Sequence, residues 1–468
     1  MGTDIQLSSL ATLLPDEEAN FFRDNVCDLL RDRKRRFPGA QPVSFTRAHL
    51  HELTQRDYFL VEKTDGLRCL LYCHQFSGEN GSPPQEAQFL IDRKNAYWYI
   101  PSGYLHLPPP AANPKAVPPY ENHSWHLNTL LDGELVRQRF GNGKEQLTFL
   151  IFDLLALDGE SMTARDYGQR IAKIDRSIIR PWEAFAKDWP EEAAVQPFQL
   201  ALKRPQAPYG TEMMFKELIP KLPHGNDGLI FTCKDTGYVC GTDDKILKWK
   251  PPHENSVDFR LRLGAFPMVT GEDGEVYEDF DGKPEISLMI YEGDRKAEGY
   301  THFGYLHLED AEWEAMKGMQ QMFDWRILEC WRDAETGRWR PKIEKDGTPR
   351  FRDDKEHANH VSVVTSVIQS IEDAVTEEDL IAAAGKIKAA WKERERLKEK
   401  AVREAKEKAM REAKERAGQQ QQQQHPQQQQ HPQQPQQQQQ PPQQRLAAPA
   451  PQPMRKVSPD EDGPGYTD

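Results

Sequence analysis

Lys63 begins the segment with the clearest chemical potential, Lys63-Thr-Asp65-Gly66-Leu-Arg68, which lies between two strand-like runs and predicts a tight turn at a strand end. Its amine is a nucleophile once deprotonated, and burial or neighbouring cations would lower its pKa from the free value of about 10.4. Gly66 would let a phosphate or ribose approach the backbone, and Arg68 offers a planar set of donors. Alone, the segment also fits a surface lysine beside a turn.

Further segments supply carboxylates and cations in chain order. They are TLLDGELV (129–136), LTFLIFDLLALDG (147–159), NDGLIFT (226–232) and ILKWKPP (246–252). Asp132 and Glu134 could hold a ribose or a divalent cation. Lys248 and Lys250 stand two apart on a strand, so both point to one side and could neutralise an α-phosphate. Each segment alone fits an ordinary turn or strand, but together they provide what nucleotidyl transfer requires.

The elements around these segments predict two domains. Short apolar runs bounded by turns, with helical patterns at 164–188 and 211–220, predict an antiparallel-rich α+β domain over residues 1–252. Residues 251–256 are interpreted as a hinge between the two domains. The short strands that follow fit an OB-fold, which is predicted over 253–360.

Both ends of the chain carry charged or polar segments. Residues 1–40 predict a leader helix, and we interpret its basic end RDRKRRF (31–37) as a solvated helix face. Residues 361–391 predict an amphipathic helical segment, capped at Thr376, that packs back on the first domain. Residues 392–417 predict a charged helix, and 418–468 a disordered Gln/Pro-rich tail. The proline-rich loop at 101–120 has no assigned role.

Composition narrows the classes of function. A net charge of −13 argues against a broad nucleic-acid binder, so RNA contacts would come from a local basic groove. The six cysteines lack the spacing of a zinc site and are expected to be reduced thiols. No N-terminal signal is visible, and no apolar run approaches membrane-spanning length.

The ordered segments resemble the covalent nucleotidyltransferase superfamily of capping enzymes and polynucleotide ligases. Over about residues 40–390 they resemble most closely the guanylyltransferase (alpha) subunit of fungal mRNA capping enzymes. KTDGLR resembles motif I, FLIDRK (89–94) motif III, LLDGELV the DGE motif, FLIFDLL motif IIIa, NDGLIF motif IV, LKWKPP motif V, and WR (339–340) with RFRDDKEHANH (350–360) motif VI. FLIDR and LKWKPP favour capping enzymes over ligases.

The resemblance also implies roles for single residues. It implies that Lys63 accepts GMP and that Asp227, with Glu134, is associated with the metal. The nucleotide contacts that it implies are Arg68 and Glu134 on the ribose, Phe152 and Ile230 around the guanine, Lys248 and Lys250 on the α-phosphate, and Arg352, Asp354 and Lys355 from the OB-fold.

The expected activity is mRNA guanylyltransfer. GMP would pass from GTP, with Mg²⁺ or Mn²⁺, through Lys63 to the 5′-diphosphate end of RNA. The chain has no HCxxxxxR phosphatase loop, so we expect a separate RNA triphosphatase (beta) subunit. The resemblance further implies binding to the phosphorylated tail of RNA polymerase II, a nuclear location and no membrane contact. Two alternatives stay open: an ATP-dependent polynucleotide ligase, and an inactive scaffold that binds RNA or polymerase.

Overall fold

The computed structural model describes residues 5–77, 82–110, 124–141, 143–272, 274–293, 299–344 and 346–423. Its contacts group the chain into two compact units, Met1–Glu399 and Lys400–Asp468. The first unit contains all the sheets of the described residues. Because both predicted domains fall inside it, their boundaries at 252 and 360 stay predictions.

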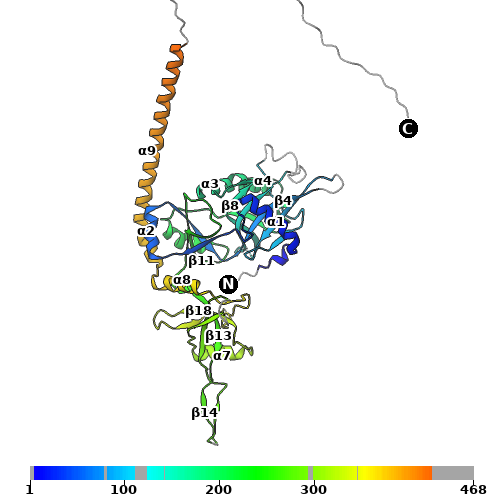
Figure 1. Cartoon of the computed structure of the whole chain (residues 1–468), viewed down its shortest axis with the longest axis vertical. Coiled ribbons are helices and arrows are strands. Elements are labelled where there is room, and N and C mark those ends of the chain that lie inside the picture. Colours follow the sequence, from blue (N-terminus) through cyan, green and yellow to red (C-terminus); the bar gives the residue numbers. More distant parts are fainter. Residues whose placement is uncertain are drawn as a thin grey trace, which may run out of the picture. The chain divides into compact units, whose positions relative to one another are not determined.

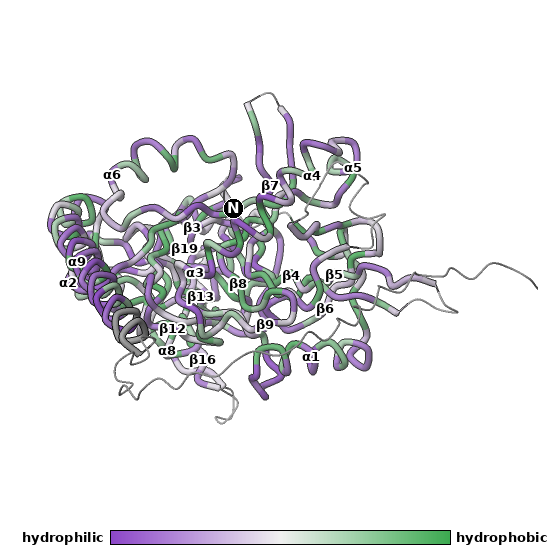
Figure 2. Tube along the Cα trace, turned by 90° about the horizontal axis from the view of Figure 1, so that it is seen from above, coloured by the Kyte–Doolittle hydropathy of each residue, from purple (hydrophilic) through white to green (hydrophobic). Residues whose placement is uncertain are grey.

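A large sheet of mostly antiparallel strands has the order β1-β6-β5-β4-β7-β8-β10, with β9 paired to β8. Only the pair β8–β10 is parallel among its described strands. The bounds are β1 Thr12–Leu13, β4 Leu67–Phe76, β5 Gln85–Ile91, β6 Tyr97–Ile100, β7 Thr129–Arg139, β8 Glu145–Leu157, β9 Glu160–Ser161 and β10 Gln199–Leu202. Strands β4 and β8 are largely hydrophobic (Figure 2), as expected for strands buried on both faces.

A second sheet carries the nucleophile candidate and has the order β2-β12-β11-β3. Its strands are β2 Ala40–Ser44, β3 Tyr58–Thr64, β11 Asn226–Cys233 and β12 Gly241–Trp249. The helical elements of this region are η1 Leu7–Ser9, α1 Asp16–Leu30, α2 Arg47–Gln55, α3 Tyr167–Ile174, η4 Asp175–Ile179, α4 Arg180–Asp188, α5 Pro190–Ala194, α6 Thr211–Met213, η5 Met214–Leu218, η6 Ile219–Lys221 and η7 Pro252–Glu254. Helices and antiparallel-rich sheets together confirm the predicted α+β class (Figure 1).

Helix α1 is shorter than the sequence predicted. Ala19, Phe22, Val26 and Leu30 recur at helical spacing and are buried, which explains the helix. Arg31 then adopts a left-handed conformation (φ 56°) and ends it. The basic run 31–37 has no apolar stripe to bury, so it forms a loop, and its interpretation as a helix face was wrong.

The remaining strands form a barrel-like sheet in the order β17-β16-β13-β18-β19, with α7 following the third strand in sequence. Its elements are β13 Ser256–Leu263, β16 Ile286–Tyr291, β17 Tyr300–Tyr305, α7 Asp310–Gly318, β18 Ile327–Arg332 and β19 Trp339–Pro341, with the hairpin β14 Met268–Thr270 and β15 Val276–Glu278 after the first strand. A bridge between Leu306 and Trp339 joins the two outer strands. This order and closure match the predicted OB-fold.

Two helices follow the barrel, and they pack differently. The apolar side of α8 (Val361–Glu372) joins the barrel core through Val364. Helix α9 (Glu377–Gln423) begins at the Thr376 cap, whose hydroxyl accepts from the Asp379 amide. Only this second helix places apolar side chains, Leu380 and Ile387, in the core of the second sheet. The predicted charged helix 392–417 is therefore a continuation of α9.

Some predictions concern residues outside the described part. The structure describes residues 101–110 of the proline-rich loop but not 111–123. Most of the Gln/Pro-rich tail, residues 424–468, also lies outside the described residues. Among the helices that are described, none combines the length and apolar character needed to cross a membrane.

Candidate active site

Lys63 is the penultimate residue of β3, beside a bulge in the neighbouring strand β11. The pairing of these strands shifts register between Asn226 and Leu229. Gly228, inside the bulge, has φ 141°, and a Cβ there would lie 2.0 Å from the Trp249 carbonyl oxygen. Only glycine fits this approach, and the bulge directs Asp227 toward Lys63.

Gly66 has a packing role that the sequence did not reveal. A Cβ at this position would lie 2.6 Å from Cγ of Glu134 and 2.7 Å from the Leu135 carbonyl oxygen. The absence of a side chain therefore brings the turn after β3 against β7. This contact sets Lys63 and Glu134 beside one cavity.

Lys63 forms an ion pair with Asp227, whose other carboxylate oxygen binds Lys250. The Nζ–Oδ distances are 2.5 Å for Lys63 and 2.8 Å for Lys250. Burial lowers the pKa of Lys63 below its usual value, and the charge of Lys250 acts in the same direction, while Asp227 opposes both. The Lys63 amine is consequently easier to deprotonate than a free lysine.

Lys248 and Asp227 also have shifted pKa values. Burial lowers the pKa of Lys248, and the neighbouring charges of Lys250, Lys63 and Arg93 lower it further. Burial alone would raise the pKa of Asp227, but Lys250 and Lys63 outweigh this effect and lower it. The region thus concentrates cations that a phosphate could neutralise.

A cavity of about 120 Å³ opens beside Lys63. Of the residues predicted from the sequence, it is lined by Lys63, Arg68, Asp132, Glu134, Phe152 and Ile230. A second cavity, of about 200 Å³, is lined by Lys248, Lys250 and Lys355. Asp227, Arg352 and Asp354 do not line either of these cavities.

Arg68 is fixed by buried partners at the first cavity. Its Nε and Nη2 donate to the two carboxylate oxygens of Asp132, at 3.0 and 2.7 Å, and Nη1 donates to the Ala40 carbonyl. Tyr238 donates to the same carboxylate at 2.6 Å. Asp132, which the sequence offered as a sugar or metal ligand, is thus fully buried and orients Arg68.

Lys203 and Arg93 line the cavity but were not among the predicted site residues. Lys203 binds Glu134 at 3.3 Å and lies 5.5 Å from the ring centre of Phe152. No motif pointed to Lys203, since it follows an unremarkable strand-like run. Arg93 belongs to FLIDRK, so its place in a motif could have suggested it.

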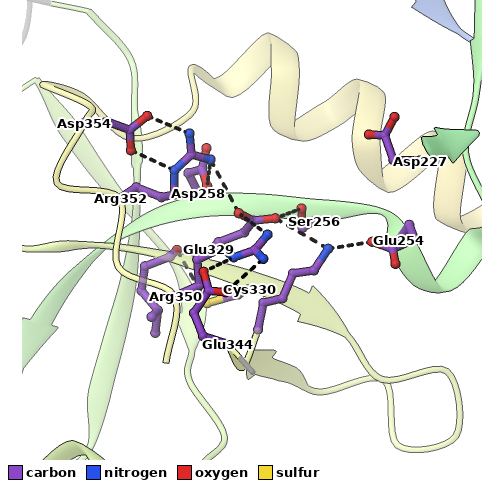
Figure 3. A network of polar contacts seen from close by, with 12 residues as sticks. Asp227, Glu254, Ser256, Asp258, Glu329, Cys330, Glu344, Arg350, Arg352 and Asp354 are labelled. Carbon is purple, nitrogen blue, oxygen red and sulfur yellow. Dashed lines mark hydrogen bonds and ion pairs between the residues drawn. The ribbon is translucent and has the colours of Figure 1, made fainter. Parts of the chain in front are cut away.

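The cations of motif VI are bound to carboxylates of the barrel (Figure 3). Arg352 binds both oxygens of Asp354 at 2.9 Å, and Asp258 and Glu329 at 3.4 Å. Lys355 pairs with Asp258. The structure brings Arg352, Asp354 and Lys355 together, and none of them lines the cavity of Lys63. Lys355 lines the second cavity with Lys248 and Lys250.

The two residues predicted to accompany a metal do not lie together in a ligand cluster. Asp227 is shared by Lys63 and Lys250, and Glu134 contacts Lys203. The described residues include no group of three or more His, Cys, Asp or Glu side chains that could hold a metal ion. A carboxylate such as Asp227 still fits Mg²⁺, which commonly takes one or two carboxylates together with substrate phosphates.

Family models match both parts of the chain that carry these features. The catalytic domain of the mRNA capping enzyme matches residues 7–252, and the C-terminal domain of the mRNA capping enzyme matches residues 254–381. The chain belongs to the mRNA capping enzyme family. This confirms the resemblance found in the sequence and the guanylyltransferase activity predicted with it.

Fungal relatives support the same assignment. The mRNA-capping enzyme subunit alpha of Neurospora crassa is 40% identical over 391 residues, covering 81% of this chain and 92% of the relative. The subunit alpha of Schizosaccharomyces pombe is 38% identical and covers 84% and 90%. A mycobacterial DNA ligase D complexed with ATP and MES aligns with 68% of this chain and 96% of its own at 16% identity, with a TM-score of 0.30, too low to inform the function.

Proposed function

We propose that Lys63 of this mRNA capping enzyme accepts GMP from GTP and passes it to the diphosphate 5′ end of RNA. The observation that carries this proposal is the setting of Lys63, a half-buried amine of lowered pKa at the edge of a cavity, which shares Asp227 with Lys250. Once it is deprotonated, such an amine is a nucleophile, and the lowered pKa makes deprotonation easier. The resemblance to capping enzymes supports the choice of substrates.

In the first step, the neutral Lys63 amine attacks the α-phosphorus of GTP. A phosphorus–nitrogen bond forms, the bond to the bridging oxygen breaks, pyrophosphate leaves, and the nitrogen releases one proton to solvent. Lys248 and Lys250 would stabilise the negative charge that develops on the α-phosphate. A divalent cation bound with the triphosphate would neutralise further charge, with Asp227 as a carboxylate ligand.

The remaining cavity residues would hold the nucleoside. Arg68, oriented by Asp132, and Glu134 would contact the ribose. Phe152 and Ile230 would provide apolar surfaces for the guanine ring. Fixing these groups before reaction places the α-phosphorus at the amine, which is where most of the rate gain in such transfers arises.

In the second step, a terminal oxygen of the RNA diphosphate attacks the phosphorus of the adduct. The phosphorus–nitrogen bond breaks, Lys63 recovers a proton, and the product carries a GpppN end. The second step uses the same cations, because the same α-phosphate again carries the developing charge.

The test is mass spectrometry of the protein after incubation with GTP and Mg²⁺. Wild type should gain the mass of one GMP, mapped to Lys63. Lys63→Ala should form no adduct, and Lys63→Arg should also form none because a guanidinium stays protonated. Lys245→Ala, in the same sheet but paired with Glu52, should load normally. Normal adduct levels in either Lys63 variant would refute the assignment.

The two alternatives can be separated by the same measurement. A polynucleotide ligase would take label from α-labelled ATP and not from GTP. A scaffold would form no covalent adduct with either nucleotide. The matches to capping-enzyme models over both parts of the chain favour GTP.

We also propose the partners that the family resemblance implies. The fungal relatives are named as alpha subunits, which supports a separate RNA triphosphatase (beta) subunit for this chain. Binding to the phosphorylated tail of RNA polymerase II, and therefore action in the nucleus, extends this proposal. Co-purification from nuclear extract should recover both, and recovery of neither would contradict it.

A further inference from the structure

Aromatic side chains cover the outer surface of the barrel at its second and third strands. In the ladder of β16 and β17, Tyr291 lies opposite Tyr300, and Met289 opposite His302. The alternate residues Leu288 and Ile290 point into the barrel core. Side chains opposite one another share a face, so the rings lie on the side away from the core. We call the following set the aromatic face: Tyr291, Tyr300, His302, Tyr305, Trp325 and His357.

The rings of the aromatic face contact one another without forming part of the barrel's buried cluster. Tyr291 and His357 stack with centroids 4.3 Å apart and planes 10° apart. His302 and Tyr305 lie 4.8 Å apart, and Tyr305 is 53% exposed. The ring of Tyr305 therefore remains open to a ligand.

Trp325 is held in a strained backbone conformation at the edge of this face. Its φ of 62° lies in the left-handed region, which a bulky side chain rarely adopts. Its indole is nevertheless 37% exposed and lies at an edge-on angle 6.1 Å from Tyr300. The fold thus retains strain at a position where it presents a large ring at the surface.

Arginine side chains lie over these rings. The guanidinium of Arg260 is 4.8 Å from the ring centre of Tyr300 and donates to the backbone carbonyls of Trp325 and Glu356. The guanidinium of Arg262 is 5.6 Å from the ring centre of Trp325. Aromatic rings interleaved with arginines suit a chain of bases joined by phosphates.

The aromatic face also continues into motif VI. His357 follows Lys355 by two residues, and the amide of Tyr291 donates to Asn359 in the same segment. Asp258 and Glu329 are buried and pair with Arg352, which also pairs with Asp354. Glu356, next to His357, is exposed. A ligand that places phosphates near motif VI could therefore extend directly over the rings.

We propose that the aromatic face binds the single-stranded RNA downstream of its 5′ diphosphate by stacking of the bases. This rests on the proposed function, which makes RNA the acceptor. Stacking suits an acceptor of any sequence, because every base offers a flat face and no base edge is read. The second and third strands of OB-folds are also a common place for oligonucleotides.

The test compares Tyr305→Ala and Trp325→Ala with wild type. The probe is a fluorescent 5′-diphosphate RNA of about 16 nucleotides, the upper site size of an OB-fold. Each variant should raise the Kd of this RNA about tenfold, since stacking on one ring is lost. Transfer of GMP to a 5′-diphosphate dinucleotide should be affected much less, because so short an acceptor has few bases to stack on the face. Tyr305→Phe and Trp325→Phe should retain most of the affinity.

Tyr277→Ala is the matched control, since Tyr277 is 55% exposed but lies on β15, away from the face. Unchanged RNA affinity in both alanine variants would overturn the proposal and would indicate that the aromatic face binds a protein instead. Equal losses for the long RNA and the dinucleotide would also overturn it. GMP loading of each variant is measured separately, so a failure of wild type to load would count against the proposed function and not against RNA binding.

Discussion

Opposing charges act on the amine of Lys63. Burial and Lys250 lower its pKa, whereas Asp227 raises it and binds it at 2.5 Å. A divalent cation that took Asp227 as a ligand would cancel the charge that holds the proton on Lys63. Metal binding and activation of the nucleophile would then be coupled through this single carboxylate.

The pH dependence of GMP loading should report this balance. Loading requires the neutral amine, so its rate should rise with pH through the pKa of Lys63. Lys250→Ala removes a charge that lowers this pKa and leaves Asp227 to Lys63 alone. Both changes raise the pKa, so the half-maximal pH of single-turnover loading should move upward relative to wild type.

Asp227→Asn supplies the opposite change. It removes the carboxylate that raises the pKa of Lys63, so its half-maximal pH should fall even though the maximal rate also falls. Shifts of both variants in the same direction would show that Lys63 is not the titrating group.

At the scale of elements, a buried ion pair joins β8 to α3. Arg170 donates to both carboxylate oxygens of Asp153, at 2.6 and 2.9 Å, and its side chain is only 2% exposed. It also donates to the carbonyls of Arg165 and Thr236. The pair therefore fixes the helix and the loop before Tyr238 against the strand that carries Phe152.

Arg170→Ala should destabilise the protein strongly. It leaves the Asp153 charge buried without its partner, which typically costs about 3–5 kcal/mol. The melting temperature should fall by about 10 °C in a domain of this size. The double variant Asp153→Asn with Arg170→Met should recover part of the loss, since no unpaired charge remains. A melting temperature equal to wild type in the single variant would contradict this role.

The sequence predicted secondary-structure elements and motif positions better than it predicted which side chains contact one another. Lys63 and Arg68 could be placed at a strand end because strand periodicity and the turn lie within a few residues. The pairing of Arg170 with Asp153 joins side chains seventeen residues apart on different elements, so local pattern carries no sign of it. Lys203 was missed for the same reason, because only the folded sheet brings it to Glu134.

At the scale of the whole molecule, the two halves of α9 differ in what they contact. Leu380, Ile387 and Trp391 are at most 5% exposed, whereas residues 400–416 are exposed throughout. Only the first part thus contributes to the core. The polar composition that follows it cannot bury apolar surface.

Truncation should separate these two parts. Removing residues 419–468 should leave GMP loading and the melting temperature unchanged. Ending the chain at Thr376 should destabilise it severely, since each large buried side chain that is lost costs about 2–5 kcal/mol. Thermal denaturation and adduct yield of both truncated chains test this. A large loss from the shorter truncation would show that the Gln/Pro-rich tail supports the fold.

The motif VI cations Arg352 and Lys355 reside on the barrel and do not line the cavity of Lys63. Arg352 and Lys355 are bound to Asp258, so GTP must compete with this carboxylate for them. They would bind the β- and γ-phosphates and set pyrophosphate opposite Lys63, which is the in-line arrangement for attack. After pyrophosphate leaves, these cations have lost their anion, and the barrel carboxylates can take them back.

Arg352→Ala or Lys355→Ala should therefore impair loading from GTP strongly and transfer from a preformed adduct much less. Each variant is loaded by prolonged incubation, freed of GTP, and given diphosphate RNA, so that the two half-reactions are timed separately. Arg326→Ala is the matched control, because this arginine pairs with Asp353 in the same segment and lines neither cavity. Equal losses in both steps would assign Arg352 and Lys355 to RNA binding or folding. Normal loading would remove them from the first step, because a cation set that is needed to orient pyrophosphate cannot be lost without slowing its departure.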